Sequence, residues 1–81
     1  MQLTLLSRSY CHLCDDMLAA LEPFRRRFAF TVDVIDIDQH PSLEERYGDL
    51  VPVLLRGEAE KGQEICHYFL DEEKLAAVFT V

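Results

Sequence analysis

The stretch 7-SRSYCHLCDDM-17 decides how the chain folds, because it marks the point at which a strand gives way to a helix. Before it, the apolar run Gln2–Ser7 predicts a short buried strand. After it, apolar residues recur at steps of three and four over residues 13–28, which predicts a helix with one apolar stripe. Cys11 and Cys14 lie at this junction, so their chemistry depends on the elements that flank them.

The rest of the pattern predicts a mixed sheet. Residues 30–37 alternate β-forming and polar side chains, and a strand there must run parallel to the first because a helix connects them. Residues 41–48 predict a short helix, residues 51–55 and 63–69 an antiparallel hairpin, and residues 72–79 a last helix. The order β-α-β-α-β-β-α predicts an α/β fold in one domain, with a mixed four-stranded sheet and three helices.

Two residues refine the helix predictions. Pro23 removes a backbone donor inside the first helix, but the apolar stripe continues to Phe28. A kinked helix is therefore predicted rather than an end at Pro23. Asp71 precedes the last helix and is expected to cap it.

Composition narrows the function. The 81 residues are 49% hydrophobic and 28% charged, as in an ordinary globular domain. The net charge of −7 argues against binding to nucleic acid, which requires clustered positive charge. The chain lacks an apolar run long enough for a membrane span or a signal core. A cytoplasmic location without membrane contact is expected, and nothing in the sequence demands more than a monomer.

The cysteine pair is predicted to be redox-active. A cytosolic chain with an odd count of three cysteines has no closed disulfide framework. Cys11 falls between a strand and a helix N-terminus, where backbone donors and the helix dipole favour a thiolate. Residues three apart on the first turn share a face, so Cys14 can close a disulfide with Cys11. We expect Cys11 to attack a disulfide and Cys14 to resolve the mixed disulfide.

Charged neighbours act on this thiolate in opposite directions. Arg8 and His12 could stabilise a negative charge at Cys11, whereas Asp15 and Asp16 oppose it. The sequence therefore sets neither the pKa of this thiol nor the reduction potential of the pair.

Two other readings of the pair stay open. The same cysteines could belong to a metal- or iron–sulfur-binding module, or to a binding scaffold whose dithiol no longer reacts. Cys66 and His67 would complete a zinc ligand set on paper. The predicted last strand lies on the far side of the sheet, however, so no metal ligands are assigned. Cys66 itself is expected to be a buried, inert thiol.

The segments 10-YCHLCD-15 and 47-YGDLVP-52, together with the element order, resemble the thioredoxin fold and, within it, small bacterial glutaredoxin-like proteins. The resemblance covers nearly the whole chain. It implies a cis bond between Val51 and Pro52 beside the dithiol, with the main chain of Val51 pairing with the substrate's cysteine. It also implies that Arg8 meets a carboxylate of glutathione.

The pattern differs from typical glutaredoxins at two places. His12-Leu13 replaces the usual Pro–Tyr pair between the cysteines, and residues 69–73 carry three acids where glutaredoxins have a glycine pair for glutathione. Glutathione and a protein disulfide both stay open as substrates, with glutathione as a candidate electron donor and no bound cofactor. Tyr10 is expected either to pack over the dithiol and shape access to it or to pack elsewhere.

Overall fold

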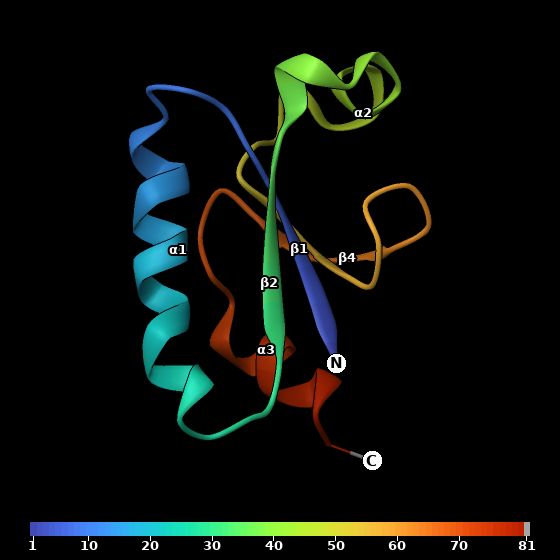
Figure 1. Ribbon diagram of the computed structural model, residues 1–81. Helices are drawn as coiled ribbons and strands as arrows, with labels where there is room; N and C mark the ends of the chain where they lie inside the picture. The colour runs from blue at the N-terminus through green and yellow to red at the C-terminus, as the bar shows by residue number, and fades with distance from the viewer. Residues whose placement is uncertain (81) are drawn as a thin grey trace.

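The structure, a computed structural model, describes residues 1–80. Strands and helices alternate through most of this range before a final hairpin and helix (Figure 1). The elements are β1 (Gln2–Ser7), α1 (His12–Arg25), β2 (Thr31–Asp36), a 3-10 turn η1 (Ile37–Gln39), α2 (Pro41–Tyr47), β3 (Val53–Arg56), β4 (Gln63–His67) and α3 (Glu72–Val78).

The strands form one mixed sheet in the order β2-β1-β3-β4. β1 runs parallel to β2 and antiparallel to β3, and β3 pairs antiparallel with β4. Leu6 of β1 lies between Ile35 on one side and Val53 on the other. This arrangement confirms the element order and the four-stranded mixed sheet predicted from the sequence.

The sheet separates two apolar clusters. Leu5 and Leu54 face α1 and α3, whereas Leu6 and Leu55 face α2 on the opposite side. Figure 1 shows α1 and α2 on opposite sides of the strands. Burial of one such leucine contributes roughly 2 kcal/mol to stability, so both layers hold the sheet in place. No helix among residues 1–80 combines the length and the apolar character needed to cross a membrane.

α1 continues through Pro23 but ends at Arg25, which corrects the predicted helix to Phe28. After the helix, the amide of Phe28 still donates to the carbonyl of Phe24 at 2.9 Å. The Phe28 ring packs against the core and stacks on Phe79 with ring centroids 4.5 Å apart. A residue in the turn after a helix can thus continue the apolar spacing of that helix, so the spacing alone does not mark where the helix ends.

The end of β4 also differs from the prediction. The strand ends at His67 rather than Phe69, because Tyr68 has a φ of 63° and turns the chain out of the sheet. The predicted cap of α3 is confirmed: Oδ1 of Asp71 accepts a hydrogen bond from the amide of Lys74 at 3.0 Å.

Candidate active site

Strand register brings two distant segments to one edge of the sheet. Leu6, near the end of β1, pairs with Val53 at the start of β3 in antiparallel register. The loop that follows β1 and the segment that precedes β3 therefore lie at the same edge. Cys11 comes from the first segment. Pro52, which is buried and joined to Val51 by a cis peptide bond, comes from the second.

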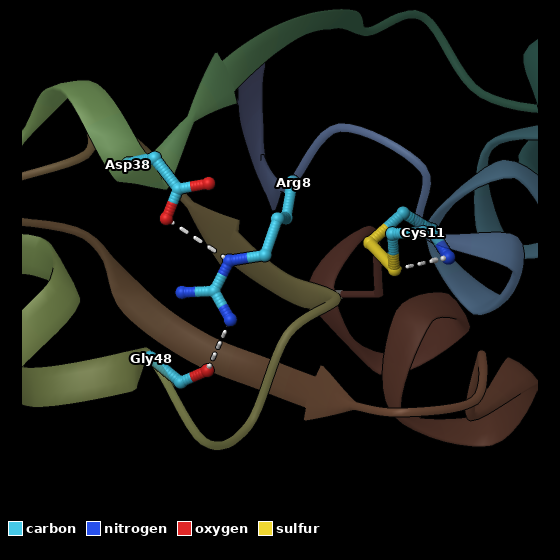
Figure 2. The surroundings of a disulfide bond; sticks show 5 residues. Arg8, Cys11, Asp38 and Gly48 are labelled. Carbon is cyan, nitrogen blue, oxygen red and sulfur yellow. Dashed lines mark hydrogen bonds and ion pairs between the residues drawn. A yellow bond between two sulfur atoms is a disulfide. The ribbon is translucent and has the colours of Figure 1, made fainter.

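The two cysteines meet at the beginning of α1. Cys11 and Cys14 are joined by a disulfide, and their Cα atoms are 5.2 Å apart, within the usual range for such a bond. Cys11 is the N-cap residue of α1, with extended backbone angles. Its Sγ accepts a hydrogen bond from the amide of Cys14 at 3.1 Å (Figure 2). The sulfur thus occupies the position at which helices stabilise negative charge.

The two sulfurs differ in access. Cys14 is 2% exposed and packs beneath the first turn of the helix, whereas Cys11 is only half-buried. A thiol arriving from solvent can therefore reach Cys11 and not Cys14. This asymmetry matches their places in the helix, because Cys14 lies within its first turn and is buried, whereas Cys11 is the cap residue at its end, next to the loop.

Arg8 is held on the α2 side of this edge. Its Nε donates to Oδ1 of Asp38 at 3.0 Å, Nη1 lies 3.5 Å from the Gly48 carbonyl oxygen, and Nη2 pairs with the carboxylate of Glu44. Figure 2 shows the guanidinium directed toward Asp38 and Gly48 and away from the disulfide. Burial lowers the pKa of Arg8, but the Glu44 hydrogen bond and the two carboxylate charges outweigh this effect and raise it.

The structure corrects the packing expected of Tyr10. Its backbone has a φ of 60°, in the left-handed region, and its side chain is fully exposed to solvent. The ring therefore covers neither the disulfide nor the core. His12, the first residue of α1, is also exposed and adjoins Cys11 in the chain.

Comparisons with known proteins identify the family of this arrangement. The family model described as Glutaredoxin-like domain (DUF836) matches residues 2–80. The chain belongs to the glutaredoxin-like domain family. No curated protein matches it.

Two solved structures share this glutaredoxin-like fold. The solution NMR structure of protein Ne2328 from Nitrosomonas europaea is 38% identical, with a TM-score of 0.85, covering 95% of this chain and 88% of that one. An X-ray structure of a protein from X. campestris is 36% identical, with a TM-score of 0.72, covering 95% and 93%. The thioredoxin-like fold class predicted from the sequence is thereby confirmed.

Val51 of this glutaredoxin-like chain has main-chain groups that are left unpaired. Among residues 1–80, its N–H and C=O take part in no backbone hydrogen bond, and the pairing of β3 starts only at Val53. The residue is half-buried. Its main-chain polar groups are therefore unpaired within the described backbone, beside Pro52 at the edge that also holds the disulfide.

Tyr68 is a neighbour of this edge that the sequence did not single out. Its amide donates to the Pro52 carbonyl at 2.9 Å, and its hydroxyl donates to the Asp49 carbonyl at 2.8 Å. It thus fixes the segment on both sides of Val51. Neither a left-handed backbone at a tyrosine nor a contact across nineteen residues leaves a periodic signal in a sequence.

The third cysteine lies in the core of the glutaredoxin-like domain. Cys66 is 5% exposed and carries a free thiol, and burial raises its pKa. Its burial agrees with the prediction. In the described range, no group of at least three His, Cys, Asp or Glu side chains is placed to hold a metal ion.

Proposed function

We propose that this protein is a thiol–disulfide oxidoreductase that uses Cys11 and Cys14. In the reduced protein, the Cys11 thiolate attacks a substrate disulfide, forms a mixed disulfide and releases one substrate thiol. The Cys14 thiolate then attacks Sγ of Cys11, forms the Cys11–Cys14 disulfide and releases the second substrate thiol. Two electrons pass to the substrate, and two protons from solvent complete its thiols.

The observation that carries this proposal is the asymmetric disulfide at the start of α1. Cys11 is accessible and its sulfur receives the amide hydrogen bond of Cys14, whereas Cys14 itself is buried. A hydrogen bond to the charged form and the positive end of the helix dipole both lower the pKa of a thiol. An inert structural pair would need neither an accessible sulfur nor a donor aimed at it.

Val51 and Pro52 supply the surface against which the substrate lies. The free main-chain groups of Val51 can pair with the backbone of a substrate cysteine, as in the addition of a strand. His12 follows Cys11 in the chain and is proposed to stabilise the negative charge on its sulfur. Arg8, bound to Asp38 and Glu44, is proposed to hold the edge together, and Tyr10 to contact substrate from solvent.

Return to the dithiol state requires a thiol donor. Two glutathione thiols can reduce the Cys11–Cys14 disulfide and leave as glutathione disulfide, or one protein dithiol can do so. Both donors are abundant in the reducing cytoplasm, which is the location that we propose.

The test is a redox titration in a Cys66→Ala background, which removes the third thiol. We expect one two-electron transition between dithiol and disulfide across a series of glutathione and glutathione disulfide mixtures. Cys14→Ser should accumulate a mixed disulfide at Cys11, whereas Cys11→Ser should react with no disulfide substrate. If Cys11→Ser keeps its reductase activity, or if no disulfide forms at any ratio, the proposal is wrong.

A further inference from the structure

A groove runs between α1 and the loop, residues 68–71, that joins β4 to α3. Its volume is about 730 Å³, within the range of ligand-binding clefts. Figure 1 shows this loop alongside α1. Met17, which lines the groove, follows Cys14 by about one helical turn. On the other wall, the amide of Tyr68 donates a hydrogen bond to the Pro52 carbonyl. One end of the groove therefore lies beside the edge that holds the disulfide, and the groove extends away from it.

Aromatic surface is exposed along this groove. Phe69 is 68% exposed and Tyr68 is 40% exposed, and both line the groove together with Leu70. Large exposed aromatic side chains that share one concave surface mark places where partners bind, because such residues supply most of the binding energy of an interface. The groove can therefore accept an apolar side chain of a partner.

Negative charge surrounds the aromatic surface. Asp16, Asp71, Glu72 and Glu73 line the groove, and none of its lining residues is basic. Asp71 is already engaged as the cap of α3. The other three are exposed and form no ion pair within the part of the chain that the structure describes. A cation placed among them would be attracted by all three.

We propose that this groove binds a basic segment of a substrate polypeptide, next to the cysteine that reacts with Cys11, with an apolar side chain against Phe69. The inference rests on the proposed function and names its substrate class. Glutathione fits the groove less well, because its two carboxylates would face Asp16, Glu72 and Glu73. A basic polypeptide instead matches both the charge and the exposed aromatic surface.

The test uses short peptides, each with one central cysteine blocked as a disulfide with 5-thio-2-nitrobenzoate. The Cys11 thiolate attacks the peptide sulfur, and the coloured thiolate leaves. Cys14 then attacks Cys11 and releases the peptide thiol, so the pre-reduced protein, with no added thiol, gives one colour equivalent in a single turnover that ends at the Cys11–Cys14 disulfide. One peptide carries lysines and a leucine beside its cysteine, a second has glutamates in place of the lysines, and a third has serine in place of the leucine.

The decisive quantity is the ratio of rate constants for the lysine and glutamate peptides. At about 20 mM salt we expect the wild type to prefer the lysine peptide by at least about tenfold, and about 0.5 M salt should remove most of this preference. A combined Asp16→Asn, Glu72→Gln, Glu73→Gln variant should lose most of it. Because one variant is compared on two peptides, any change in the intrinsic reactivity of Cys11 cancels.

A matched variant controls for net charge. Asp33, Glu45 and Glu58 are exposed, lie outside the groove and form no ion pair within residues 1–80. Their combined replacement by Asn, Gln and Gln changes the net charge by the same amount and should leave the ratio within about twofold of wild type. If both combined variants lower the ratio equally, only the overall charge matters and the groove has no role.

Phe69→Ala tests the apolar part of the proposal. It should slow the lysine peptide that contains leucine and have little effect on the version with serine, because only the leucine loses its contact. Equal effects on both peptides would contradict a role for the ring.

Two outcomes separate this inference from the proposed function. If the wild type reduces the peptides but shows no charge preference, or if it reacts faster with glutathione disulfide than with the lysine peptide, the groove proposal fails and the oxidoreductase stands. If neither the peptides nor the neutral small molecule hydroxyethyl disulfide is reduced, the oxidoreductase proposal itself fails.

Discussion

The Nε atom of Arg8 lies 3.0 Å from Oδ1 of Asp38, although thirty residues separate them in the chain. With the second pair to Glu44, this contact ties the loop after β1 to η1 and α2. The three side chains are partly exposed, so the pairs are screened by salt. Their main effect is to place the segments that border the site.

The first prediction concerns this pairing. Arg8→Met should lower the melting temperature by roughly 2–5 °C at low salt and by less at about 1 M salt, because screening already weakens the pairs that it removes. Thermal unfolding followed by circular dichroism measures both values. Arg26→Met is the control, because Arg26 is exposed and forms no ion pair among residues 1–80. Equal effects of the two variants would show that the pairing adds nothing specific.

The second prediction concerns the pH dependence of stability through Cys66. Burial raises the pKa of this thiol in the folded state above its ordinary value of 9.0. The resulting stabilisation is therefore complete below the ordinary pKa and is lost as the pH rises through the raised folded pKa.

Urea unfolding of the oxidised protein measures this effect, since Cys11 and Cys14 then do not titrate. The difference in unfolding free energy between wild type and Cys66→Ala should be constant up to about pH 8 and shrink by about pH 10. The alanine variant corrects for other groups that titrate at high pH. A difference that stays constant over this range would contradict the raised pKa.

A third prediction concerns the hydroxyl of Tyr68. Tyr68→Phe removes the hydrogen bond to the Asp49 carbonyl and should lower the unfolding free energy by about 0.5–1 kcal/mol. Because that bond fixes the segment before Val51, reduction of a disulfide peptide should slow more than alkylation of Cys11 by iodoacetamide. Tyr47→Phe is the control, because Tyr47 is the last residue of α2 and packs against the cluster there, and its hydroxyl accepts a hydrogen bond from Arg46 instead of binding the segment before Val51. Loss of both reactions in equal proportion would show that Tyr68 affects only the thiolate.

The fourth prediction concerns Thr4, a polar residue that is fully buried in β1. Its hydroxyl donates to the Gly57 carbonyl at 2.6 Å. Thr4→Val keeps the shape but leaves that carbonyl without this partner, which should cost about 1–2 kcal/mol in urea unfolding. Thr4→Ser keeps the hydroxyl and loses a methyl group, so a larger loss in Thr4→Ser would show that packing dominates at this position.

Periodicity was sufficient to predict the elements that bury apolar faces. The run Leu3–Leu6 and the spacing of Met17, Leu21 and Phe24 both report burial, and burial is what positions β1 and α1. The boundary at Phe28 was wrong because a residue in a turn can fill the same apolar space as the next helical turn. Local pattern cannot distinguish these two cases.

The site was only partly predictable. The spacing of Cys11 and Cys14 indicated their pairing, and the resemblance indicated the place of Val51 and Pro52. The partners of Arg8 could not be predicted, because the sequence does not state which distant carboxylate the fold will bring near a cation. Tyr68 was missed for a similar reason, since its role depends on a left-handed backbone conformation.

The enclosure of Cys14 has a kinetic consequence. Since Cys11 is more open to solvent than Cys14, the proposed oxidoreductase would bond its electron donor and its electron acceptor to the same sulfur in turn. In the proposed reaction the two partners therefore cannot both be bonded to the protein at once, which predicts a double-displacement scheme. Each partner in excess should then inhibit competitively against the other, and the flux will depend on their relative concentrations as well as on reduction potential.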